Sequence, residues 1–245
     1  MKKSEEIKKI VKDKYKKIAT TNCGCGCSCK SNQDVSKEIG YSDEDLMVGK
    51  EANLGLGCGN PVAISKIKEG DVVLDLGCGS GLDCFLASKK VGENGKVIGV
   101  DMTEEMIKKA KINAEKQGIK NVEFVSAEIE NLPIEDNSID IIITNCVINL
   151  TPDKIKTFKE AYRVLKEGGK IYLSDIVLLA ELSEKQKNDE DLLSGCVAGA
   201  LLKEDYLNKI KSVDFKVSIL SENKEISKQQ YQGIALESLM IELTK

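Results

Sequence analysis

Apolar residues form short runs that recur along most of the chain and predict a series of strands. The run VVLDLG at 72–77 ends in glycine, which is typical of a strand buried on both faces. Comparable runs predict strands over 96–101, 121–127, 139–145 and 170–178. A final pair of strands is predicted over 215–222 and 235–245.

Helices are predicted between these runs and at the amino terminus. In 1–19 the apolar residues have helical spacing and predict an amphipathic helix; they are Ile7, Ile10, Val11, Tyr15 and Ile18. Further helices are predicted over 82–90, from Thr103 to about Gly118, and over a short polar segment at 43–50. Glu104 and Glu105 fall in the first turn of the second of these, where the helix dipole favours acids. Thr151-Pro152-Asp153 opens another helix, with proline at its first position and Gly168-Gly169 past its end.

Alternation of strands and helices predicts an α/β fold with a doubly wound, mostly parallel, seven-stranded Rossmann-like sheet. We divide the chain into an amino-terminal helix with a cysteine-rich arm at 1–60 and the sheet domain at 61–245. A long insertion at about 180–203 follows the fifth strand. We expect it to form a lid over the carboxyl edge of the sheet.

Charge and hydropathy exclude several classes of function. The 245 residues are 41% hydrophobic and 31% charged, with a net charge of −4, which disfavours a nucleic-acid partner. No apolar run reaches the roughly 18 residues that a membrane helix needs, and the amino terminus lacks the apolar core of a signal peptide. We therefore expect a cytoplasmic protein that contacts no membrane, and we expect a monomer.

Cysteine usage points to thiol chemistry. The chain has nine cysteines and no histidine, so histidine-based triads, metal sites and general bases are excluded. An odd number of cysteines in a cytosolic chain favours metal or redox chemistry over a disulfide framework. The run CGCGCSC places Cys23, Cys25, Cys27 and Cys29 at every second position, which suits a disulfide ladder, a soft metal or a redox relay. Its spacing departs from the usual C-x₂₋₄-C zinc pattern.

The segment DLGCGSG follows the first strand of the sheet domain and opens a helix. Gly77, Gly79 and Gly81 allow a tight turn and close approach of the backbone to a ligand. A dinucleotide fingerprint would need a third glycine where this chain has Leu82, so the loop suits a cofactor without a pyrophosphate. Asp101 ends the next strand and can accept both ribose hydroxyls of a nucleoside.

These residues resemble the class I S-adenosylmethionine methyltransferases over about 71–178. The resemblance implies that Asp75 and Gly77 face the methionine part of the cofactor and that Asp101 holds the ribose, with Met102 beside the adenine. It further implies that Glu128 and Ile129 border the adenine edge. Asn145 and Val147 are implied to line the sulfonium side of the cofactor.

Three other cysteines fall in segments that such a sheet would bring together. Cys58 precedes the sheet domain, Cys146 follows the fourth strand, and Cys196 lies in the insertion. Carboxyl ends of strands are where ligands bind in open sheets, and three thiolates can hold a soft, thiophilic ion with trigonal geometry.

The segments LGLGCGNP, GLDCF, NCVINLTPDK and SGCVAGAL together resemble the arsenite S-adenosylmethionine methyltransferases over nearly the whole chain. The resemblance implies that Cys58, Cys146 and Cys196 bind As(III), joined by one of the four thiols of the arm. It also implies arsenite or its thiol conjugates as substrate, and glutathione or thioredoxin as reductant. Tyr15 is implied near the cofactor, although Lys16 stands where the family often has glycine. Larger relatives carry a carboxyl-terminal domain that this sequence does not contain.

Other interpretations stay open at this point. The chain could be a metalloid-binding protein on an inactive methyltransferase fold, as the CGCGCSC run suggests. It could also be a methyltransferase for a small organic substrate, with incidental thiols. Cys78 and Cys84 are interpreted as packing residues, since cysteine often behaves as a small buried hydrophobe.

Overall fold

The computed structural model describes residues 3–21, 31–226, 231 and 233–245. The CGCGCSC run therefore lies outside the described residues, and the metal or redox role predicted for its four thiols stays a prediction.

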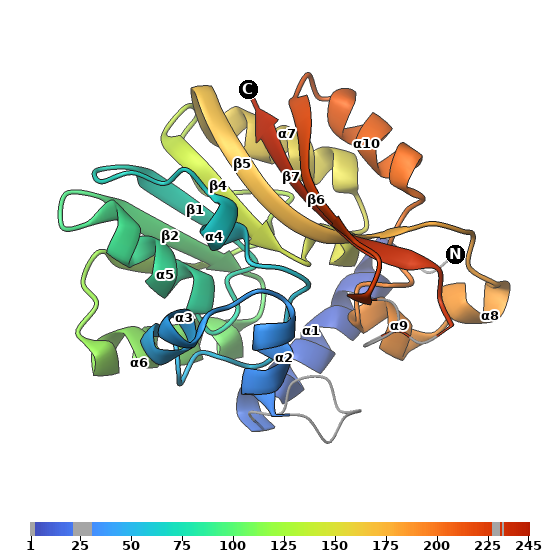
Figure 1. Cartoon of the computed structure of the whole chain (residues 1–245), viewed down its shortest axis with the longest axis horizontal. Helices are drawn as coiled ribbons and strands as arrows, with labels where there is room; N and C mark the ends of the chain where they lie inside the picture. Colours follow the sequence, from blue (N-terminus) through green and yellow to red (C-terminus); the bar gives the residue numbers. More distant parts are fainter. Residues whose placement is uncertain (1–2, 22–30, 227–230, 232) are drawn as a thin grey trace.

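A single seven-stranded sheet forms the centre of the molecule, with strand order β3-β2-β1-β4-β5-β7-β6 (Figure 1). The strands are β1 (Val72–Leu76), β2 (Lys96–Asp101), β3 (Val122–Ser126), β4 (Ile139–Asn145), β5 (Leu165–Leu178), β6 (Lys216–Asn223) and β7 (Leu236–Thr244). β7 runs antiparallel to both of its neighbours, β5 and β6, and the pairs among β1 to β5 are parallel. The predicted Rossmann-like fold is confirmed.

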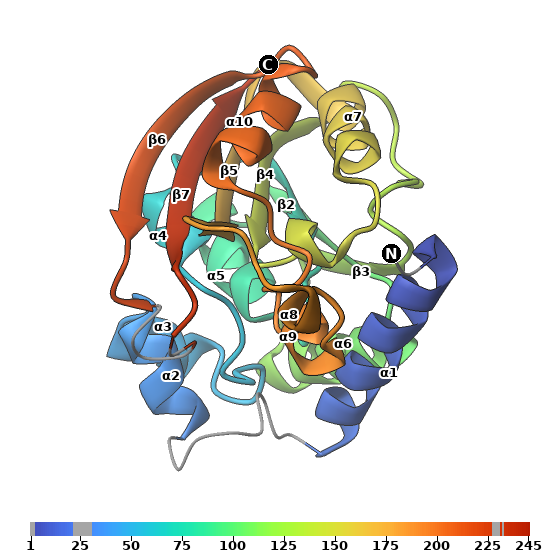
Figure 2. The ribbon, with the colours of Figure 1, turned by 90° about the vertical axis from the view of Figure 1, so that its right-hand side faces the viewer.

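Helices cover both faces of the sheet. The α-helices are α1 (Ser4–Thr21), α2 (Asn32–Glu38), α3 (Asp43–Val48), α4 (Pro61–Ile64), α5 (Leu82–Val91), α6 (Glu104–Gln117), α7 (Lys154–Val164), α8 (Glu184–Lys187), α9 (Glu190–Ser194) and α10 (Lys203–Lys211), with a 3₁₀ turn η1 (Ile148–Leu150). α4, α5 and α6 pack on one face, and α7 and α10 on the other (Figure 2).

Alternation along the strands divides the core into two layers. On β1, Val73 packs in the layer under α5, with Phe85, whereas Leu74 packs in the layer under α7, with Phe158. Both strand residues are fully buried, which explains why the run lacks polar alternation.

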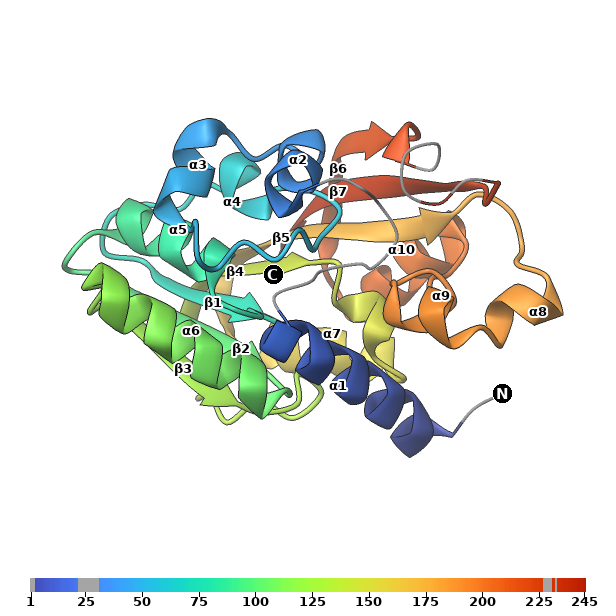
Figure 3. The same cartoon turned by 90° about the horizontal axis from the view of Figure 1, so that it is seen from below.

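The lid segment predicted at about 180–203 contains α8 and α9. α9 contacts α1, and α1 in turn contacts α6 (Figure 3). The predicted amphipathic helix therefore runs along the end of the sheet and joins the segment to the sheet domain. Val11, Ile18 and Ala19 are its buried residues.

The predicted boundaries around α7 are wrong. Asp153 is the amino-terminal cap and accepts a hydrogen bond from the Lys156 amide at 3.0 Å, so Pro152 precedes the cap. The helix ends at Val164, and Gly168-Gly169 lies inside β5. The β4–β5 register shifts there, so the glycines occupy an irregularity within a strand instead of a helix end.

Two smaller differences concern helix starts. The short helix α2 was not predicted, although Ser31 and Asp34 form a reciprocal capping box at its first turn. Thr103 is the cap residue of α6 as predicted, but its side chain makes no capping hydrogen bond.

Among the described residues, no helix combines the length and apolarity needed to cross a bilayer.

Replacing Phe158 with alanine should lower the free energy of unfolding by about 3–5 kcal/mol, because it opens a cavity in the layer under α7. The ring is 2% exposed and packs edge-on against Tyr206, with ring centroids 6.0 Å apart. Urea unfolding followed by circular dichroism measures the loss. Met47→Ala, at a side chain that is 79% exposed, should change stability by less than about 0.5 kcal/mol. Equal effects of the two substitutions would contradict the assigned core.

Candidate active site

The glycine loop between β1 and α5 is hydrogen-bonded to β2 and leaves open space beside Gly79. The amides of Gly77 and Cys78 donate to the Val100 carbonyl at 2.8 and 3.0 Å. Gly77 has φ +73°, and a Cβ there would lie 2.4 Å from a methyl carbon of Val147. Gly79 has φ +51°, and a Cβ there would meet no atom within 4 Å. The loop thus needs glycine at 77 for packing and leaves space at 79 for a ligand to approach the backbone.

Buried carboxylates lie beneath this loop. Asp101 accepts hydrogen bonds from the amides of Gly79 and Thr103, at 3.0 and 2.8 Å, and burial raises its pKa. Asp75 is 2% exposed and accepts from the Cys84 thiol at 3.2 Å. Burial, followed by the charge of Asp83, raises the pKa of Asp75 well above its usual range. A cationic ligand in this place would stabilise the ionised forms.

A cavity of about 420 Å³ extends from the end of β2 and β3 to α1. Met102 and Glu128 line it, and their predicted place beside an adenine stays a prediction. The Ile129 side chain is buried in the layer under α7, so only its backbone can border the cavity. Lys8 on α1 pairs with Glu128 at 2.7 Å and with Glu130 at 3.3 Å, which holds the helix over the cavity.

Asn145, at the end of β4, positions the segment that carries Cys58. Its Oδ1 accepts from the Cys58 amide at 3.0 Å, and its Nδ2 donates to the Gly59 carbonyl at 2.8 Å and to the Tyr41 hydroxyl at 2.9 Å. A Cβ at Gly57 would lie 2.7 Å from Asn145 Nδ2, and one at Gly59 would lie 2.2 Å from Ser174 Oγ. Glycines flank Cys58 because its segment packs directly against the ends of β4 and β5.

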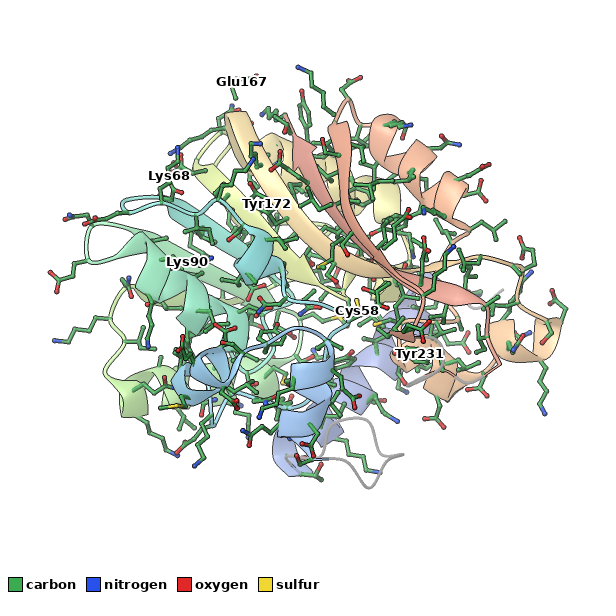
Figure 4. All side chains as sticks on the ribbon, in the orientation of Figure 1. Cys58, Lys68, Lys90, Glu167, Tyr172 and Tyr231 are labelled. Carbon is green, nitrogen blue, oxygen red and sulfur yellow. The ribbon has the colours of Figure 1, made fainter. Side chains whose placement is uncertain are left out.

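Cys146 joins the three cysteines at this edge of the sheet: its thiol contacts those of Cys58 and Cys196, and all three residues are buried. The sulfurs of Cys58 and Cys146 and a carboxylate oxygen of Asp175 lie within 4.8 Å of one another. Cys196 contacts the Cys146 thiol, and its own Sγ donates to the Cys146 carbonyl at 2.8 Å. Cys58, labelled in Figure 4, lies where the strand ends, α1 and the lid segment approach each other.

Two of these cysteines have left-handed backbone conformations. Cys146 has φ +60° and Cys196 has φ +67°, which are uncommon for residues with a side chain and cluster at functional sites. The Cys146 amide donates to the Ser174 carbonyl at 2.7 Å, so the turn is fixed by β5. A Cβ at Gly199 would lie 2.1 Å from the Asn149 carbonyl oxygen, so the glycine in SGCVAGA lets the lid segment approach closely.

Thiol contacts and burial disfavour the thiolates of Cys146 and Cys196 in the free protein. Contacts with Cys196 and then Cys58, together with burial, raise the pKa of the Cys146 thiol well above its usual range. Contact with Cys146 lowers the pKa of the Cys196 thiol, but burial and the nearby Asp175 raise it, and the net shift is upward. Tyr15 on α1 hydrogen-bonds to the Cys196 thiol, which places this tyrosine beside the three cysteines.

A buried polar network under the thiols was missed from the sequence. Asp175 accepts from Asn149 Nδ2 at 2.8 Å, from the Ile176 amide at 3.0 Å and from the Tyr206 hydroxyl at 3.0 Å. Burial raises the pKa of Asp175 to about 7 and lowers that of Lys154 to about 8. The signal was an acid inside the otherwise apolar run KIYLSDIVL, since buried charges are rare without a partner or a function.

Comparisons with known proteins agree with this geometry. Residues 67–236 match the family model described as a methyltransferase domain. An arsenite methyltransferase of Halobacterium salinarum is 42% identical over 226 residues, covering 86% of this chain and 58% of that protein. The crystal structure of CrArsM, an arsenic (III) S-adenosylmethionine methyltransferase from Chlamydomonas reinhardtii, superposes with a TM-score of 0.65 at 33% identity. That match covers 89% of this chain and 75% of CrArsM.

A third match concerns the fold alone. A phosphoethanolamine N-methyltransferase of Haemonchus contortus, solved with S-adenosyl-L-methionine, is 19% identical with a TM-score of 0.65. The chain spans about half the length of the arsenite methyltransferases it matches, at 58%, 51% and 45% of three of them.

The raised pKa of Cys146 predicts an unusual pH profile of alkylation. Because the thiolate reacts and the neutral thiol does not, the rate should keep rising about tenfold per pH unit beyond pH 9. A cysteine in a short unstructured peptide, the comparison thiol, should level off once the pH exceeds its pKa of about 8.5. Iodoacetamide labelling of the folded protein, quantified by peptide mass spectrometry, measures both rates. A plateau for Cys146 near pH 8.5 would show that its neighbours do not disfavour the thiolate.

Proposed function

We propose that this chain, which belongs to the methyltransferase-domain family and within it to the arsenite S-adenosylmethionine methyltransferases, transfers a methyl group from S-adenosylmethionine to thiol-bound As(III). The observation that carries the proposal is the convergence of Cys58, Cys146 and Cys196 beside the glycine loop. Val147, the residue after Cys146, packs against Gly77, so the thiols and the cofactor loop share one wall.

The thiols supply the substrate site in this proposal. Cys58, Cys146 and Cys196 exchange with the ligands of arsenite or of its thiol conjugates and bind As(III) as a trigonal tris-thiolate. As(III) keeps a lone pair in this complex and can attack the methyl carbon directly. No proton needs to be removed from the nucleophile, so a chain without histidine can carry out the reaction. The remaining tasks are alignment of the two reactants and exclusion of water, and the burial of the thiols serves both.

The cofactor residues follow from the geometry of the glycine loop. S-adenosylmethionine would supply an electrophilic methyl group and a positive charge. Asp101 would bind the ribose, and Met102 and Glu128 would border the adenine in the cavity under α1. Asp75 and Gly77 would face the methionine part, where the buried carboxylate offsets the charge of the ligand. Asn145 would act through Cys58, whose segment it holds, while Val147 and Tyr15 line the wall between the two sites.

A redox step completes the proposal. Methyl transfer raises arsenic to the pentavalent state, and two thiolates can return two electrons by leaving as a disulfide. Arsenic is then trivalent again, and glutathione or thioredoxin would reduce the disulfide to two thiols. We propose that a thiol among Cys23, Cys25, Cys27 and Cys29 takes part in this exchange, in a protein of the cytoplasm that acts as a monomer.

A metalloid-binding protein without catalysis is the second candidate. The group formed by Cys58, Cys146 and Asp175 favours it, because two sulfurs and a carboxylate can hold a soft divalent ion. This candidate requires tight binding of metalloids without consumption of S-adenosylmethionine. A methyltransferase for a small organic substrate would instead keep its turnover when the thiols are replaced.

Incubation of the protein with arsenite, glutathione and labelled S-adenosylmethionine should yield methylated arsenic, detected by chromatography with elemental mass spectrometry. Cys146→Ser and Cys196→Ser should each lower the yield at least about 100-fold, because two sulfurs cannot form the trigonal site. Cys84→Ser, a thiol buried away from the three, should retain arsenite binding. Normal cofactor binding without methylated arsenic would refute the assignment.

Gly77→Ala should lower the affinity for S-adenosylhomocysteine at least about tenfold, measured by isothermal titration calorimetry, because its Cβ collides with Val147. Gly118→Ala is the matched control. Gly118 has a similar φ of +66° but nothing within 4 Å of its Cβ, so backbone strain without the collision should leave the affinity unchanged. Equal affinities of the two variants would place the cofactor elsewhere.

A further inference from the structure

A carboxylate lies among the thiols of the proposed substrate site. The sulfurs of Cys58 and Cys146 and one oxygen of Asp175 are within 4.8 Å of each other, so a single bound ion can contact all three. Asp175 is fully buried on β5, and its place is fixed by pairing with Leu239 on β7. A buried charge at this position has an electrostatic effect that water does not screen.

The surroundings of Asp175 orient its carboxyl group. Its Oδ1 accepts from Asn149 and from the Ile176 amide, and its Oδ2 accepts from the Tyr206 hydroxyl. The nearby ammonium of Lys154 donates to the carbonyl oxygens of Asn149 and Thr151, at 3.4 and 3.2 Å. Asp175 therefore has donors that fix its carboxyl group beside the sulfurs of Cys58 and Cys146.

Methyl transfer to arsenic moves a positive charge toward this carboxylate. As(III) held by three thiolates is neutral. When its lone pair forms the As–C bond, the C–S bond of the sulfonium breaks and the bonding pair stays on sulfur. The cofactor becomes a neutral thioether, and the methylated arsenic centre carries the positive charge. An anion beside arsenic therefore stabilises the transition state more than the neutral ground state.

We propose that the Asp175 carboxylate is a catalytic group that stabilises the positive charge arriving on arsenic with the methyl group. This inference rests on the proposed function and adds an electrostatic component to that reaction. Because bound As(III) is neutral, the carboxylate contributes to the rate of transfer and little to the affinity for arsenite.

Asp175→Asn tests the assignment, since asparagine keeps the size of the side chain and removes the charge. The single-turnover rate with saturating arsenite and S-adenosylmethionine should fall about 100- to 1,000-fold, the range seen when one preorganised group is removed. Dissociation constants for arsenite and S-adenosylhomocysteine should stay within about twofold of the wild type. Asp175→Glu, which restores a charge, should recover part of the rate. Glu242→Gln is the matched control, because it also removes the charge of a buried acid. Glu242 lies on β7 and accepts a hydrogen bond from Tyr172, which is three residues before Asp175 on β5.

Binding of Cd²⁺ alone gives a readout that does not depend on catalysis. As(III) bound by three thiolates takes no further ligand, whereas Cd²⁺ bound by two thiolates has open coordination positions, and the Asp175 carboxylate can fill one as an anionic ligand. Asp175→Asn should therefore lower the affinity for Cd²⁺ at least about tenfold while leaving that for arsenite unchanged. The ultraviolet absorption of the Cd²⁺–thiolate bond measures the affinity for Cd²⁺, and equilibrium dialysis measures the affinity for arsenite.

The outcomes distinguish a failure of the role proposed for Asp175 from a failure of the proposed function. An unchanged transfer rate in Asp175→Asn would overturn the role of Asp175 and leave the proposed function standing. Equal losses of arsenite and Cd²⁺ affinity would also overturn it, because they indicate a structural role. If Asp175→Asn does not fold, the smaller Asp175→Ser replaces it with the same expectations. Wild-type protein that binds arsenite but transfers no methyl group would overturn the proposed function and the catalytic role together.

Discussion

The register between β4 and β5 is the constraint on which the candidate site depends. It pairs Asn145, the last residue of β4, with Ser174 in β5, which continues to Leu178. Cys146 follows one of these residues and Asp175 the other, and the Cys146 amide bonds to the Ser174 carbonyl. Cys58 is attached to both strands at this level, through Asn145 and Ser174. A shift of this register by one residue would separate the thiols and turn Asp175 to the other face.

Three buried acids with no ion-pair partner among the described residues lie at this edge of the sheet. Asp75 and Asp101 lie under the glycine loop, and Asp175 lies under the thiols. Burial raises the pKa of each, which records the cost of ionising a carboxyl away from water. A sulfonium cofactor with an ammonium group would bring positive charge to the first pair, and its reaction would carry charge toward the third. A positively charged ligand would offset the cost of ionising these carboxyl groups. The site would therefore bind states with positive charge near the carboxylates more tightly than neutral states.

The amino-terminal helix connects the two halves of the site. α1 pairs with Glu128 at the rim of the cavity through Lys8, and with Asp191 on α9 through Lys14. Tyr15, the residue after Lys14, lies close to the Cys196 thiol. One helix therefore contacts the cavity at the ends of β2 and β3, the segment that carries α9, and the thiol of Cys196.

The sequence by itself determined the order of strands and helices, the glycine loop and Asp101, because these follow from local periodicity and from residues adjacent in the chain. It also singled out Cys58, Cys146 and Cys196, since parallel strands end at a common edge. Only the tertiary structure decided that Gly168-Gly169 lies in an irregular strand, and that Asp175 with Asn149, Tyr206 and Lys154 forms a network under the thiols. These outcomes depend on strand register and on packing between residues far apart in sequence, and no local pattern records either.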